Sequence, residues 1–142
     1  ESIYREELVL AYTRTHRPVP PKKIKVAQLG LYPLVLPSAP NTIRALVDKT
    51  CRDLNVQLNI VAEVDVVHTI VETTSYGNVF TVIPRSAIGD IPGHAELAFS
   101  AIIEPVIKNN LTLALPVNGP NSKLAGATAD LIRGLDISYY MQ

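Results

Sequence analysis

A short apolar strand that runs directly into a helix start is the feature of this chain that most limits its fold. Residues 32–37 (YPLVLP) suit one buried strand, and residues 38–44 (SAPNTIR) carry the proline, hydroxyl and amide side chains typical of a helix start. A strand followed at once by a helix begins a βαβ unit. Helix N–H groups then lie at the carboxyl end of a strand, where small anions bind in open α/β sheets. The stretch predicts an α/β small-molecule-binding domain.

The remainder of the chain continues this alternation of strands and helices. Apolar residues at helical spacing predict helices over residues 41–54, 65–77 (with Asp65 as N-cap) and about 121–135. Apolar runs predict strands over residues 8–12, 34–36, 58–63, 79–84, 96–103 and 111–115. The prolines within residues 14–25 predict an exposed connector without regular structure. This order predicts an α/β fold with a mixed, mostly parallel sheet flanked by helices.

Composition excludes several classes of protein. The 142 residues are enough for one domain with a core, and 47% of them are hydrophobic. Lys plus Arg and Asp plus Glu number 13 each, so the chain lacks the basic excess of a nucleic-acid-binding module. No apolar run approaches the ~20 residues of a membrane span. A single cysteine, Cys51, forbids an internal disulfide and fits the cytoplasm, on a buried helix stripe where an inert thiol is expected.

Motifs for catalysis or metal binding are absent from the sequence. His16, His68 and His94 lack the spacing of zinc ligands, and there is no GxSxG elbow, P-loop or GxGxxG motif. Glu63 and Asp65 are close together, but a capping role for Asp65 explains the pair more simply than carboxylate catalysis. We therefore expect no enzyme activity, no metal and no cofactor.

Several short motifs, taken in order, resemble the effector-binding region of LysR-type transcriptional regulators. They are residues 6–10 (EELVL), 15–18 (THRP), 32–37 (YPLVLP), 60–65 (IVAEVD), 82–87 (VIPRSA) and 104–114. The resemblance covers about residues 4–135. It implies a lobe like that of type 2 periplasmic binding proteins, with a small ligand held between two lobes.

The resemblance also implies how the chain is divided and what it works with. Residues 1–12 and 106–142 would be parts of regulatory subdomain I, and residues 13–105 would form subdomain II. The family's helix-turn-helix is not in this chain, so contact with DNA would come only through that N-terminal part. The expected partners are a small-molecule effector and further copies in a homo-oligomer, a dimer or tetramer, in the cytoplasm and without a membrane. Self-association or strand exchange would cover the apolar flanks.

Position in the pattern and in the resembling family selects eight candidate effector-binding residues. For each group a plainer alternative stays open: helix capping for Ser38 and Asn41, surface or packing for His68, and core for Phe80. Thr13, with Tyr12, is expected at the first crossover between lobes. The candidates are Ser38, Ala39, Asn41 and Thr42 at the first helix start, His68 and Thr69 at the second, and Phe80 and Thr13.

The favoured function is effector sensing in a LysR-type regulator, through a small, anionic metabolite that shifts the balance between lobe arrangements. An aromatic acid is equally admissible as the effector. The alternative is a solute-binding protein of a transport system with the same fold. A small α/β enzyme is a third reading, disfavoured by the missing motifs.

Overall fold

The computed structural model describes residues 1–88, 96–115 and 123–140. The elements follow one another in the order β1 (Ser2–Thr13), β2 (Lys23–Lys25), the 3-10 helix η1 (Val26–Leu31), β3 (Pro33–Leu36), α1 (Thr42–Asp53), β4 (Asn59–Glu63), α2 (Val67–Tyr76), β5 (Thr81–Pro84), the 3-10 helix η2 (Arg85–Ile88), β6 (Leu97–Ile103), β7 (Lys108–Thr112), α3 (Lys123–Gly134) and α4 (Ile137–Tyr140).

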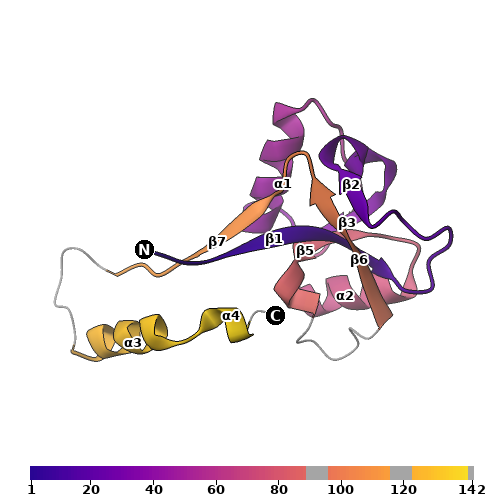
Figure 1. Cartoon of the computed structure of the whole chain (residues 1–142). Coiled ribbons are helices and arrows are strands. Elements are labelled where there is room, and N and C mark those ends of the chain that lie inside the picture. The colour runs from indigo at the N-terminus through magenta and orange to yellow at the C-terminus, as the bar shows by residue number, and fades with distance from the viewer. Residues whose placement is uncertain (89–95, 116–122, 141–142) are drawn as a thin grey trace.

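The long strand β1 joins two parts of the molecule (Figure 1). Its second half is the middle of a sheet, where Leu8 pairs with Pro84 of β5 and Val9 with Ala101 of β6, both antiparallel. Its first half pairs antiparallel with β7, from Ser2 to Glu7. β1 therefore changes partner between Glu7 and Leu8, where a lobe of α/β structure gives way to a two-stranded ribbon.

The sheet of the lobe is mixed, as predicted. β2 runs parallel to β6, and β3 runs parallel to β4. A parallel bridge between Leu34 and Phe80 connects β3 to β5. Since β5 is antiparallel to β1, β5 and its parallel neighbours β3 and β4 all run back toward the ribbon. Their carboxyl ends consequently lie at one edge of the sheet.

Helices cover both faces of this sheet, α1 on one side and α2 on the other (Figure 1). On the α1 side, Leu8 and Leu10 of β1 join Val47 and Cys51 of α1 in the main apolar core. The predicted stripe of α1 is thus the face that is buried. On α2 the buried residues are Ile70, Val71 and Thr74.

The prediction of an irregular connector over residues 14–25 is wrong for its last three residues. Lys23–Lys25 form β2, and Ile24 is fully buried against the sheet, opposite Ile102. The following η1 buries Val26 and Leu29. The prolines disfavour regular structure only in the segment before β2, because none of them lies within the strand.

Two further predictions need correction. The strand predicted over residues 111–115 is Lys108–Thr112, because its register is fixed by pairing with the first half of β1. α2 starts at Val67 with Val66 as N-cap and no side-chain cap, so Asp65 does not cap it. The expected start of the third helix at residues 121–122 lies outside the described residues.

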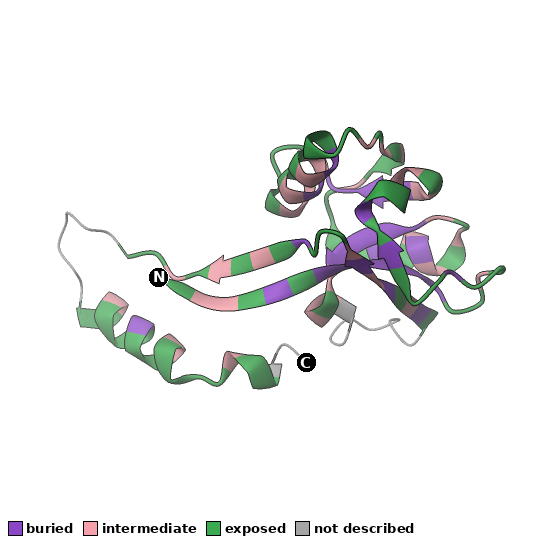
Figure 2. Ribbon diagram, turned by 45° about the horizontal axis from the view of Figure 1, so that its top comes forward, coloured by how far each residue is buried: buried purple, intermediate pink, exposed green. Residues whose placement is uncertain are grey.

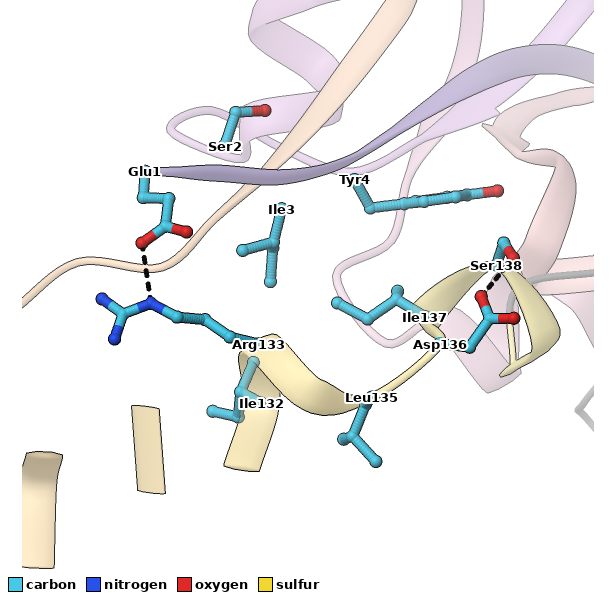
Figure 3. Close-up of a pocket in the computed structure, with 10 residues that line it drawn as sticks. All are labelled: Glu1, Ser2, Ile3, Tyr4, Ile132, Arg133, Leu135, Asp136, Ile137 and Ser138. Carbon is cyan, nitrogen blue, oxygen red and sulfur yellow. Dashed lines mark hydrogen bonds and ion pairs between the residues drawn. The ribbon is translucent and has the colours of Figure 1, made fainter. Parts of the chain in front are cut away.

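The C-terminal helices lie along the ribbon and are largely exposed (Figures 1 and 2). Within α3 only Ala129 is buried, whereas Leu124 and Leu131 of the predicted apolar face are 76% and 67% exposed. A pocket of about 350 Å³ separates the start of β1 from α3 and α4, and Arg133 Nε contacts Glu1 Oε2 across it at 3.0 Å (Figure 3). None of the helices in the described ranges has the length and apolar character of a membrane span.

Candidate ligand-binding site

The edge where β3, β4 and β5 end collects polar side chains from segments far apart in the sequence. Ser38 follows β3 and Asp65 follows β4. Both the backbone N–H and the hydroxyl of Ser38 donate to Asp65 Oδ1, at N···O 2.9 Å and O···O 2.6 Å. The carboxylate of Asp65 therefore ties the two strand ends together instead of capping α2.

This pair changes the chemistry expected at Ser38. Hydrogen bonds from the Ser38 hydroxyl and then its backbone N–H hold the pKa of Asp65 below its ordinary value of 3.8. The donors that were expected to bind an anion at Ser38 are thus occupied by a carboxylate of the protein. At this position the edge offers a ligand a hydrogen-bond acceptor.

The two helix starts at this edge differ in how their N–H groups are satisfied. Asn41 Oδ1 accepts from Ile43 N at 2.9 Å and from Arg44 N at 3.2 Å, so the capping role foreseen for Asn41 is confirmed. At α2 no side chain caps the first turn, and His68 and Thr69 in that turn are exposed. Uncapped N–H groups carry partial positive charge, so the start of α2 is the better position for an anion.

Arg44 links the start of α1 to the ends of β3 and β4. Its Nε lies 2.9 Å from Asp48 Oδ2, and its Nη1 donates to the carbonyl of Pro37 at 2.9 Å and lies 3.6 Å from Glu63 Oε1. The sequence pattern did not predict this role for Arg44, whose side chain is only 14% exposed. The i,i+4 spacing of Arg44 and Asp48 was the available signal.

Glu6 is a buried acid at the point where the ribbon leaves the lobe. Ser86 Oγ, just beyond β5, donates to Glu6 Oε2 at 2.5 Å, and Asn109 Nδ2 of β7 donates to Oε1 at 2.8 Å. Glu6 is 7% exposed. Glu6 lies two residues before the buried Leu8 and so points to the same face of β1. The alternation of side chains along a strand could therefore have identified Glu6 as buried. The three side chains join β1 and β7 to the segment just after β5.

The remaining candidates are divided between this edge and other parts of the lobe. Thr42 and Ala39 are exposed beside Asn41. Thr13 is at the far end of β1, away from the partner change between Glu7 and Leu8. It lies instead in a hollow with His68, described below.

Phe80 belongs to the core, the plainer of its two alternatives. It is buried, and its ring centroid lies 4.8 Å from that of His16, 4.9 Å from Tyr32 and 5.8 Å from Tyr12. This aromatic cluster is at the amino end of β5, opposite the edge that holds Ser38. Phe80 therefore supports the lobe rather than that edge.

Cys51 behaves as a small, buried apolar side chain. Burial, and then the nearby carboxylate of Asp48, raises the pKa of the thiol to about 11, which keeps it protonated. Within the described ranges, no group of three or more His, Cys, Asp or Glu side chains could hold a metal ion. His94 lies outside those ranges.

The LysR substrate binding domain is the family whose model matches this chain, over residues 1–135. The chain belongs to this family. The predicted fold, that of a type 2 periplasmic-binding-protein lobe, is confirmed with it. The comparisons do not favour the transport alternative, and no curated protein sequence matches the chain.

Solved structures of the same family share the fold at low sequence identity. The effector-binding domain of QuiR in complex with shikimate has a TM-score of 0.78 at 21% identity, over 92% of this chain and 61% of that one. The CcmR regulatory domain of Synechocystis PCC6803 in complex with 2-PG has 0.82 at 16%, over 94% and 64%. Full-length CbnR with its target DNA has 0.65 at 22%, over 78% and 38%. This chain thus spans less than two thirds of each of these chains.

Proposed function

We propose that this chain is the effector-sensing part of a LysR-type regulator and binds a small metabolite where β3, β4 and β5 end. The observation that carries the proposal is the uncapped start of α2 beside the Ser38–Asp65 pair. Together they offer N–H donors to an anionic group and a carboxylate oxygen to a hydroxyl of the same ligand. Catalysis is not part of the proposal.

This combination favours a hydroxylated acid as the effector. An acid group at the first turn of α2 would lie near His68 and Thr69, and a hydroxyl would donate to Asp65. Shikimate, which QuiR holds, is a hydroxylated carboxylic acid, and 2-PG is held by CcmR. These ligands support the class and do not identify the effector of this chain.

Signal transmission would depend on β1 and β7, the strands that we propose cross between the two lobes. The ligand must bind one lobe arrangement better than the other in order to shift their populations. Glu6 links β1 and β7 to the segment after β5, so a ligand at that edge acts next to the crossover. The division into subdomain parts (residues 1–12 and 106–142, and residues 13–105) belongs to this proposal. The proposal also includes a second lobe that closes the other side of the ligand site. It further includes DNA binding through an N-terminal helix-turn-helix, a homo-oligomer and a cytoplasmic location.

Amide chemical shifts recorded by NMR during titration with shikimate and other small hydroxylated acids test the site. The expected result is a set of saturable shifts at Ser38 and at residues 65–69. These shifts should be lost in His68→Ala combined with Asp65→Asn and kept in the control Lys49→Ala, on the exposed face of α1. Shifts confined to other residues, or the same shifts in the double variant, would exclude this edge as the site.

A further inference from the structure

A hollow of about 330 Å³ runs along α2, on the side of the lobe where β1 ends and β6 begins. α2 supplies five of the lining residues: His68, Glu72 and Tyr76, which are spaced four residues apart, and Val71 and Ser75. The other lining residues are Thr13 at the end of β1, Thr15 just beyond it, and Glu96 before β6.

The charge of this hollow is negative. Glu72 and Glu96 line it, and neither carboxylate has an ion pair or hydrogen bond within the part of the chain that the structure describes. No Lys or Arg side chain is among the described residues that line it. The nearby Arg14 donates from Nε to the carbonyl of Leu97 at 3.0 Å and, among the described residues, forms no ion pair with Glu72 or Glu96. Two carboxylates around a confined space attract a cation.

Hydroxyl groups and a small apolar surface complete the lining. Thr13 is buried, and its Oγ1 lies 3.1 Å from Thr15 Oγ1. Ser75 Oγ donates to the Val71 carbonyl at 2.9 Å, which leaves its lone pairs to accept from a ligand. Val71 and the exposed ring of Tyr76 offer contacts for methylene groups, and an aromatic face also attracts a cation.

The acceptors are suited to an organic cation. The described residues hold no group of three or more His, Cys, Asp or Glu side chains that could bind a metal ion. An ammonium group donates three hydrogen bonds, which carboxylates and hydroxyls can accept. We propose that this hollow, which shares only His68 with the proposed effector site, binds a small protonated amine with a methylene chain, such as a linear diamine.

Calorimetric titration of the chain with putrescine tests this proposal, using Glu72→Gln and Glu96→Gln as variants. Both side chains are exposed, so the variants should fold as the parent does. The expected result is saturable one-to-one binding that each variant weakens by roughly fivefold or more. Glu7→Gln is the matched control, because Glu7 is an exposed acid on the ribbon, and it should leave binding unchanged.

Two further measurements distinguish the site from general charge attraction. Neutral 1,4-butanediol should not bind, and Ser38→Ala should bind putrescine as the parent does. The proposal is overturned if putrescine shows no saturable binding, if Glu7→Gln weakens binding as much as the two other variants, or if butanediol binds equally well. Each outcome is independent of whether a hydroxylated acid binds at the strand ends.

Discussion

At the scale of single residues, Thr81 is a buried hydroxyl without a hydrogen-bond partner among the described residues. An unsatisfied buried hydroxyl costs about 1–3 kcal/mol, so Thr81→Val, which keeps the shape, should raise the free energy of unfolding by roughly 1 kcal/mol. Urea denaturation measures it. Thr74→Val is the matched control, because the Thr74 hydroxyl donates to the Ile70 carbonyl at 2.7 Å and its loss should bring no such gain. A destabilised Thr81→Val would show that this hydroxyl has a partner.

Also at the residue scale, the Ser38–Asp65 pair predicts a pH effect. The pKa of Asp65 is lowered in the folded chain, so the pair stabilises the fold above the ordinary pKa of 3.8. This contribution is lost as the pH falls through the lower, folded-state pKa. Carboxyl-carbon NMR should find that Asp65 titrates below 3.8 in the parent and closer to 3.8 in Ser38→Ala. Equal titration midpoints in the two proteins would contradict the role given to Ser38.

At the scale of elements, Glu6 fixes how the ribbon joins the lobe. Glu6→Ala leaves Ser86 Oγ and Asn109 Nδ2 without their acceptor, so we expect a loss of roughly 1.5–3 kcal/mol in the free energy of unfolding. Glu7→Ala, one residue along β1 and exposed, should change it by less than about 0.5 kcal/mol. Equal losses in the two variants would mean that strand pairing alone, not the buried hydrogen bonds, holds the junction.

Elements governed by local pattern were predictable from the sequence, and those governed by distant contacts were not. The apolar spacing of α1 and the Asn41 cap are local, and both are found as predicted. Asp65, in contrast, turns to Ser38 on another strand end, so the expected cap of α2 is missing. Lys23–Lys25 become a strand only because β6 lies beside them. For the same reason, the site's Glu6 junction, formed by three distant segments, was not foreseen.

At the scale of the whole molecule, the core lies in the lobe, and the C-terminal helices add little to it. Leu8, Leu10 and Val47 are fully buried, whereas α3 buries only Ala129 (Figure 2). The ion pair between Arg133 and Glu1 is exposed on both sides, so it adds little to stability. Leu124 and Leu131 of α3 remain exposed.

A variant that ends at Leu115 tests this division of the molecule. Because α3 and α4 bury little apolar surface, its free energy of unfolding should fall by less than about 1 kcal/mol. Leu10→Ala, in the core of the lobe, should cost roughly 2–5 kcal/mol in the same urea titration. Hydrogen exchange should agree, with amides of residues 8–13 exchanging slowest and those of α3 fastest. A large loss on truncation would instead make the helices part of the lobe's cooperative unit, because only shared packing couples the unfolding of two segments.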